Sequence, residues 1–127
     1  MVLKQQLEKK NGIILFYTRI DIFKEYILDI KDRVAIVTGG AVRVGRAISL
    51  ALAKEAATVV LAARSVEKLQ ETAEIIAQAD GKAEIVVTEL ADEDSIKNLI
   101  KTTKEKFNRL DILINNAGIT HSAKLEQ

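Results

Sequence analysis

Four short apolar runs recur along the chain from residue 34 onward, separated by longer segments whose apolar positions follow a helical period. The runs cover residues 34–38, 58–62, 84–88 and 110–114. Continuous apolar runs of this length are typical of strands buried on both faces. We therefore predict a β-α-β-α-β-α-β series with parallel strands and right-handed helical crossovers.

The three intervening segments are expected to be helices. The first covers residues 46–57. Ser65 is a suitable N-cap for a second helix that ends near residue 80, and Asp92 for a third. Asn108 stands where the third helix needs a left-handed C-terminal residue, a conformation that Asn tolerates.

Residues 1–27 differ from the rest, because they hold both tyrosines and two of the three phenylalanines. Their apolar positions lie at roughly helical spacing, so we expect a helical N-terminal extension and a domain over residues 28–127. The extension is either a docking helix for a partner or an appended segment packed loosely on the domain, and the second interpretation is preferred.

Composition limits the classes of protein that fit. The length of 127 residues suits one domain, and 48% hydrophobic residues with only 4% aromatics suit an aliphatic core. A net charge of +1 favours neither a nucleic-acid nor a membrane-surface partner. The absence of cysteine excludes disulfides and thiolate metal sites, and we predict no metal site. The apolar run at residues 13–17 is too short to span a bilayer, so we expect a soluble cytoplasmic protein.

Glycines mark the junction between the first strand and the first helix. Gly39 and Gly40 follow the strand at once, and Gly45 opens the helix. Such a turn lets the backbone approach a phosphate, and the free N–H groups at the helix start then point at the anion. The spacing from Gly40 to Gly45 also fits a P-loop, but Arg46 and Ala47 replace the required Lys and Ser/Thr, which argues against an NTPase. The pattern therefore predicts a nucleotide site of another kind.

The end of the second strand distinguishes between dinucleotides. An acidic residue there would bind the ribose hydroxyls of NAD, whereas Arg would accommodate the 2′-phosphate of NADP. The chain reads Leu61-Ala62-Ala63-Arg64 and offers no carboxylate. A cation is mildly unfavourable at a helix start, which argues that Arg64 is there to bind a phosphate. Arg64 therefore favours NADP, with NAD as the alternative. The less favoured alternative is that Arg64 is a surface residue at a helix start.

Two motifs together resemble the short-chain dehydrogenase/reductase family. They are residues 38–45, Thr-Gly-Gly-Ala-Val-Arg-Val-Gly, and residues 115–118, Asn-Asn-Ala-Gly. The resemblance covers roughly residues 28–122 and includes features of the 3-oxoacyl-carrier-protein reductases or of a pteridine-reductase-like branch. It implies an NAD(P)-dependent oxidoreductase with a Rossmann-type doubly wound parallel sheet, here truncated to four strands in the order 3-2-1-4.

The resemblance also implies roles for particular residues. The turn would wrap the pyrophosphate and adenosine ribose, Arg64 would meet the 2′-phosphate, and residues 89–90 would flank the adenine. Residues 116–118 would pass beside the ribose next to the nicotinamide. The implied cofactor-binding residues are Gly39, Gly40, Ala41, Val42, Arg43, Val44, Gly45, Arg64, Glu89, Leu90, Asn116, Ala117 and Gly118.

Three positions depart from the family pattern. Arg43 replaces the usual second glycine, as it does in the pteridine-reductase-like subgroup, and could add a phosphate or substrate contact. Ala56 stands where a helix-ending Gly is usual, and Glu89 where Asp is usual.

The family's chemistry uses a Ser and a Tyr-x-x-x-Lys pair, in which the Lys lowers the pKa of the Tyr. The only tyrosines, Tyr17 and Tyr26, precede the first strand and are followed four residues later by Asp21 and Ile30. We therefore predict no catalytic residue and expect the cofactor-binding part of an NADP-dependent reductase. The alternatives are a non-catalytic nucleotide-binding or interaction module and a degenerate product. The fourth strand is expected to be an uncovered apolar edge, open to self-association.

Overall fold

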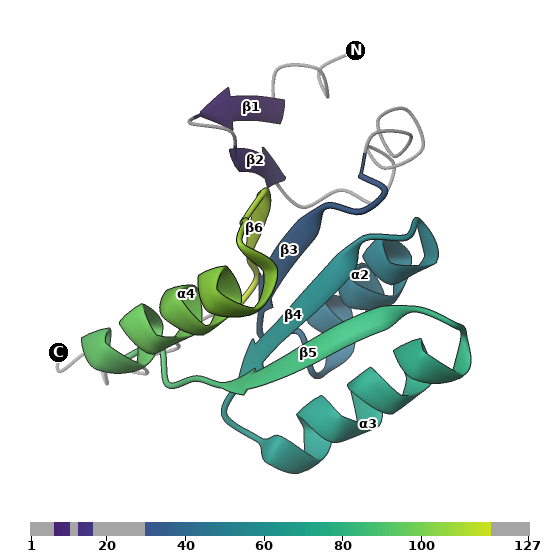
Figure 1. Ribbon diagram of the computed structural model, residues 1–127. Coiled ribbons are helices and arrows are strands. Elements are labelled where there is room, and N and C mark those ends of the chain that lie inside the picture. Colours follow the sequence, from purple (N-terminus) through teal and green to yellow (C-terminus); the bar gives the residue numbers. More distant parts are fainter. Residues whose placement is uncertain (1–6, 11–12, 17–29, 118–127) are drawn as a thin grey trace, which may run out of the picture.

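A six-stranded sheet with helices on both faces forms the body of the protein (Figure 1). The computed structural model describes residues 7–10, 13–16 and 30–117. In chain order the elements are β1 (Leu7–Lys10), β2 (Ile13–Phe16), β3 (Val34–Thr38), α2 (Arg43–Lys54), β4 (Thr58–Ala63), α3 (Val66–Gln78), β5 (Lys82–Val87), α4 (Glu93–Phe107) and β6 (Ile112–Asn115).

The four strands expected from the apolar runs are present and parallel. They lie in the order β5-β4-β3-β6, which is the predicted 3-2-1-4 arrangement of a Rossmann-type fold. Thr38, the last residue of β3, pairs with Ala62 of β4 on one side and Asn115 of β6 on the other. The carboxyl ends of the strands therefore meet at one edge of the sheet.

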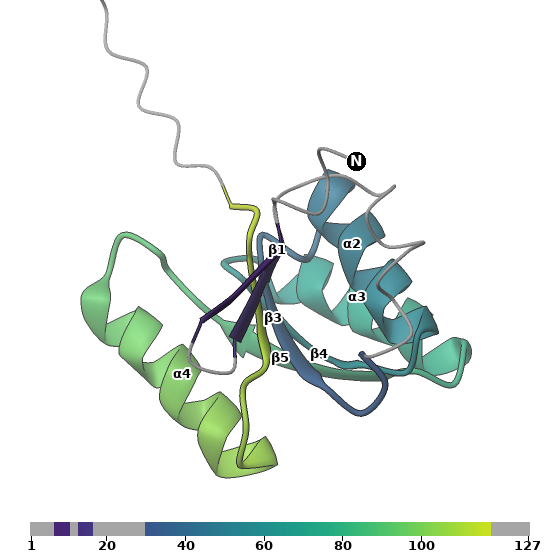
Figure 2. The ribbon, with the colours of Figure 1, turned by 90° about the horizontal axis from the view of Figure 1, so that it is seen from above.

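The helices cover the two faces of the sheet, with α2 and α3 on one face and α4 on the other (Figure 2). All five residues of β3 are buried, so this strand is covered on both faces of the sheet. Ala35 and Val37 belong to the core that contains residues of α2 and α3. Val34 and Ile36 belong to the core that contains Leu99 of α4. The alternation of side chains along a strand thus turns one continuous apolar run into two cores.

Both predicted N-caps are confirmed. The Ser65 side chain accepts a hydrogen bond from the Lys68 N–H, and the Asp92 side chain accepts one from the Asp94 N–H. Asn108 ends α4 with a left-handed φ of 54°, as predicted.

The bounds of the first helix differ from the prediction of residues 46–57. Helix α2 begins three residues earlier, at Arg43, and ends at Lys54. Gly45 therefore lies inside its first turn. The helix stops early because Ala56 adopts a left-handed φ of 64°, which redirects the chain into β4.

The helical prediction for the N-terminal extension is wrong where the structure describes that segment. Residues 7–10 and 13–16 form an antiparallel hairpin, β1 and β2. Short apolar runs do not distinguish helix from strand by periodicity, and the edge of β6 offers a backbone partner that only a strand can use. Residues 1–6, 11–12 and 17–29 lie outside the described ranges, and with them the predicted boundary between residues 27 and 28.

The expectation that the fourth strand is uncovered is also wrong. Strand β2 pairs in parallel with β6, with Ile14 opposite Ile112 and Leu15 opposite Leu113. Strand β6 thus has β3 on one side and β2 on the other. Within the described residues, the outer strands of the sheet are β1 and β5.

Asp111 joins the amino-terminal ends of β3 and β6. Its Oδ2 accepts from the Val34 N–H at 2.9 Å, and its carboxylate receives two hydrogen bonds from Arg109 at 2.7 and 2.8 Å. Burial raises the pKa of the Asp111 carboxyl, but the hydrogen bonds from Arg109, Val34 and Arg33 outweigh it and hold the pKa below its usual value. This carboxylate fixes β6 against β3 at the end of the sheet away from the glycine turn.

Among the helices of the described ranges, none combines the length and the apolar character that crossing a bilayer requires.

Candidate functional site

The candidate site lies where the strand order reverses. From β3 the chain continues to β4 on one side, whereas β6 lies on the other side. In open α/β sheets, ligands bind outside the carboxyl ends of the strands at such a point. Here the glycine turn after β3 meets Asn116 and Ala117, which follow β6, at that edge.

Two glycines of the turn are required by the geometry. Gly39 adopts a φ of 64° and donates its N–H to the Ala62 carbonyl at 2.8 Å. Gly45 is buried, and a Cβ on it would run into the Gly39 carbonyl and would lie 2.6 Å from Asn116 Nδ2. Only glycine lets the start of α2 pack this closely on the turn.

A hydroxyl connects the two loops. Thr38 Oγ1 donates to the Ile114 carbonyl at 3.2 Å and accepts from the N–H groups of Asn116 and Ala117 at 3.1 and 3.2 Å. The Asn116 side chain in turn donates to the Gly39 carbonyl at 3.3 Å. The segments after β3 and β6 therefore form one hydrogen-bonded unit. Thr38 belongs to the family-like motif, but sequence reasoning gave it no role.

The N-terminus of α2 differs from those of the other described helices. Its N-cap, Val42, makes no side-chain capping bond, and its first turn carries no acidic residue. Helices α3 and α4 both have a side-chain cap and acidic residues in the first turn. The positive end of the α2 dipole is thus free of negative side chains at the glycine turn, an arrangement that suits an anion.

Arg43 occupies a backbone conformation that suits glycine. Its φ is 51°, and its side chain is exposed. A left-handed conformation costs a residue with a Cβ roughly 1–2 kcal/mol. Arg43 therefore keeps the left-handed backbone conformation that the family's glycine would adopt, and it places a cation at the start of α2.

Arg64 and Glu89 end neighbouring strands and face each other. Arg64 Nη1 lies 3.9 Å from Glu89 Oε2, with side chains 80% and 48% exposed. The other carboxylate oxygen of Glu89 accepts from the Ala91 N–H at 3.1 Å, and the Glu89 N–H donates to Ser95 Oγ at 2.8 Å. Leu90 follows and is half-buried. A loose, exposed ion pair of this kind contributes little to stability, so the guanidinium is available to a ligand.

The structure brings most of the predicted residues to one edge. The turn residues 39–45 and the pair Asn116 and Ala117 lie together, and Arg64 and Glu89 lie at the ends of the next strands. Gly118 falls outside the described residues. Sequence reasoning missed Arg46 and Thr72, which both bond to the Ala41 carbonyl in the turn, because only packing of α3 beside α2 brings them together.

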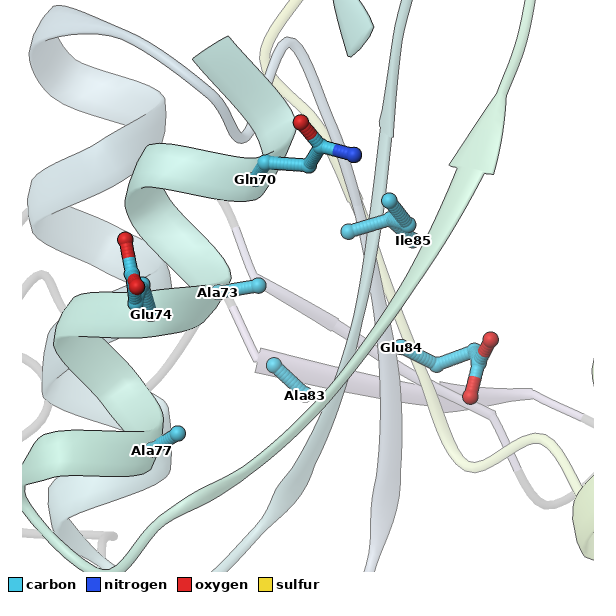
Figure 3. A pocket seen from close by; sticks show the side chains of 7 residues that line it. All are labelled: Gln70, Ala73, Glu74, Ala77, Ala83, Glu84 and Ile85. Carbon is cyan, nitrogen blue, oxygen red and sulfur yellow. The ribbon is translucent and has the colours of Figure 1, made fainter. Parts of the chain in front are cut away.

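A separate hollow of about 540 Å³ lies between α3 and the outer strand β5 (Figure 3). Gln70 and Ile85 point toward each other across it, whereas Glu84 points away and pairs with Lys106 at 2.6 Å. The rest of the lining is Ala73, Glu74, Ala77 and Ala83. None of the predicted site residues lines this hollow, and it offers a dinucleotide no phosphate-binding backbone.

Residues 33–127 match the family described as short chain dehydrogenase. The chain belongs to the short-chain dehydrogenase family. The match begins just before β3 and includes both motifs at the candidate site.

Curated relatives are similar over about three quarters of this chain. A 3-oxoacyl-[acyl-carrier-protein] reductase of Thermotoga maritima is 35% identical over 96 residues, covering 76% of this chain and 39% of the relative. A 3beta-hydroxysteroid dehydrogenase of Mediterraneibacter gnavus is 34% identical over 93 residues, covering 73% of this chain and 34% of the relative. An uncharacterized oxidoreductase of Staphylococcus aureus is 42% identical over 94 residues, covering 74% of this chain and 40% of the relative.

Solved structures of short-chain dehydrogenases share the fold. A metagenomic short-chain oxidoreductase in complex with NADP is 38% identical with a TM-score of 0.69, over 71% of this chain and 41% of that one. A short-chain type dehydrogenase/reductase from Mycobacterium marinum gives a TM-score of 0.73 at 29% identity, over 80% of this chain and 41% of that one. The chain thus spans well under half the length of these proteins.

Proposed function

We propose that this chain binds a nicotinamide dinucleotide at the carboxyl edge of its sheet and forms the cofactor-binding part of an oxidoreductase acting on alcohol or carbonyl groups. The observation that carries the proposal is the uncapped start of α2 against Gly39, with Gly45 and Asn116 packed behind it. The cradle fits a pyrophosphate because Gly39, Gly40 and Gly45 carry no Cβ atom and the start of the helix is positive. The family membership and one relative's complex with NADP support this choice of ligand.

Each predicted residue keeps the role that the resemblance implies. The turn from Gly39 to Gly45 would hold the pyrophosphate and the adenosine ribose, and Glu89 with Leu90 would flank the adenine. Asn116 and Ala117, continuing to Gly118, would lie beside the ribose next to the nicotinamide. The dinucleotide supplies the hydride when bound, and the chain's own residues bind and orient it.

We infer a preference for NADP over NAD from Arg64. Its side chain is 80% exposed just after β4, and its contact to Glu89 is long at 3.9 Å. A guanidinium can bind the 2′-phosphate through two parallel hydrogen bonds, which Arg64 could offer without breaking a tight ion pair.

Fluorescence titration of the purified chain with NADPH and NADH tests both proposals. We expect NADPH to bind more tightly than NADH, and Arg64→Gln to weaken NADPH by about tenfold while changing NADH little. Lys82→Gln, which removes an exposed cation at the start of β5, is the matched control. A folded wild-type chain that binds neither dinucleotide defeats the proposed function. Equal effects of Arg64→Gln on both defeat only the NADP preference.

One observation favours the alternative of a non-catalytic nucleotide-binding or interaction module. The hairpin of β1 and β2 pairs with the edge of β6, so the chain covers that edge with its own N-terminal segment. Turnover separates the two: a module binds NADPH yet reduces no carbonyl substrate, even when the other part of a family enzyme is supplied in trans. The self-association expected through an uncovered fourth strand loses its basis, because β2 pairs with β6. Cytoplasmic location stays a prediction, to be checked by cell fractionation.

A further inference from the structure

Arg46 lies in the first turn of α2, directly after Gly45, and its guanidinium contacts other groups of the protein. A basic residue at this end of a helix opposes the helix dipole, so its presence there needs a compensating contact. The guanidinium Nη2 lies 3.1 Å from Glu71 Oε2 on α3, and the Arg46 side chain is only 29% exposed. The cation is therefore turned toward α3.

The same side chain holds a carbonyl of the glycine turn. Arg46 Nε donates to the Ala41 carbonyl at 3.1 Å and to Thr72 Oγ1 at 2.9 Å. The Thr72 hydroxyl, which is fully buried, donates to the same Ala41 carbonyl at 2.9 Å. Two donors from two helices thus converge on one oxygen of the turn. The bond from Arg46 to the Thr72 hydroxyl also holds the two donors beside each other.

Holding that carbonyl fixes the next amide. The peptide bond between Ala41 and Val42 is planar and trans, so its N–H points opposite to its C=O. Because the Ala41 oxygen is bound to Arg46 and Thr72, the Val42 N–H is directed away from α3. Without these donors, the peptide could rotate about its flanking dihedrals.

We propose that Arg46 is a positioning residue for the dinucleotide pyrophosphate, acting through the Ala41 carbonyl and held in place by Glu71. This inference rests on the proposed function. The pyrophosphate is bound by turn amides that Arg46 and Thr72 orient before the ligand arrives, and preorganised donors bind an anion more tightly than donors that must first be ordered.

Two ligands separate this role from a general structural one. NADPH carries the pyrophosphate, whereas adenosine 2′-monophosphate shares its adenine, ribose and 2′-phosphate and lacks the pyrophosphate. We expect Arg46→Gln to raise the Kd for NADPH about tenfold, the effect of losing one charge-assisted hydrogen bond, and to leave the Kd for adenosine 2′-monophosphate unchanged. Arg46→Lys should not restore NADPH binding, because an ammonium cannot reproduce the fork that reaches Ala41 and Glu71 together.

Variants on α3 provide the matched pair. Glu71→Gln should weaken NADPH binding in the same direction as Arg46→Gln, since it releases the guanidinium. Glu74→Gln, at an exposed position one turn later on the same helix, should have no effect. A ligand-free readout is the ¹⁵N order parameter of the Val42 amide, which should fall in Arg46→Gln.

The outcomes are distinguishable. If the wild type binds NADPH and Arg46→Gln binds it equally well, the inference is overturned while the proposed function stands. Equal weakening of both ligands would show that Arg46 merely stabilises the fold, which also overturns it. If folded wild type binds no NADPH, the proposed function and the pyrophosphate role fail together. In that case an unchanged Val42 order parameter would further show that Arg46 does not hold the turn.

Discussion

The Thr38 hydroxyl, at the end of β3, accepts a hydrogen bond from the Asn116 N–H, beyond the end of β6, at 3.1 Å. The two residues are 78 positions apart in the chain. Their bond joins the glycine turn to the segment that would lie beside the nicotinamide. The two parts of the candidate site therefore share one side chain, and a change there should affect both.

Removing that hydroxyl should destabilise the fold. Thr38→Val removes the side-chain acceptor of the Ala117 N–H and one of the two acceptors of the Asn116 N–H, which keeps the Ile114 carbonyl at 3.1 Å, at a cost of about 1–3 kcal/mol in the free energy of unfolding. Thr38→Ser keeps the hydroxyl and is the matched control. Urea unfolding measures both, and a Val variant as stable as the Ser variant would show that the two amides find other partners.

Acid should remove the contribution of Asp111. Its folded pKa lies below the unfolded value of about 3.9. The stabilisation is therefore fully present above the unfolded pKa and is lost as the pH falls through the folded pKa. Urea midpoints measured from neutral pH down to about pH 2 should show this loss in the wild type and a flatter profile in Asp111→Asn.

Glycine at position 56 should stabilise the protein. Ala56 is exposed and ends α2 with a φ of 64°, which costs an alanine roughly 1–2 kcal/mol. Ala56→Gly relieves this strain and should raise the free energy of unfolding by about 1 kcal/mol. Ala79 ends α3 with a φ of −97°, so Ala79→Gly should instead be neutral or destabilising. Thermal unfolding compares the two, and destabilisation by Ala56→Gly would contradict the prediction.

Neutralising Glu89 should sharpen the preference for NADPH. Its carboxylate lies 3.9 Å from Arg64 and would compete with a 2′-phosphate for the guanidinium. We expect Glu89→Gln to lower the Kd for NADPH about threefold at low salt, within the range of an exposed ion pair, and to change the Kd for NADH little. The amide oxygen can still accept from the Ala91 N–H, so the loop should keep its conformation. A rise in the Kd for NADPH would mean that Glu89 instead assists the phosphate.

The sequence by itself determined the four main strands of the domain, the helices between them and the parallel orientation of these strands. The β3 strand was predicted with its observed bounds, because a run of four apolar residues and a threonine between polar turns has few alternatives. Ser65, Asp92 and Asn108 marked helix ends correctly, because capping is a local interaction between a side chain and a backbone group within a few residues. The glycine turn was likewise visible, since its residue types are needed for local backbone geometry.

Tertiary structure alone decided which long-range partners complete these elements. Residues 13–16 carry no signal that separates helix from strand, and the open edge of β6 selects the strand. The bond from Thr72 to the Ala41 carbonyl and the contact of Thr72 with Arg46 require α2 and α3 to pack side by side, a relationship that no local pattern encodes. Local spacing specifies hydrogen bonds within a few residues, whereas contacts between distant segments depend on how the whole sheet is assembled.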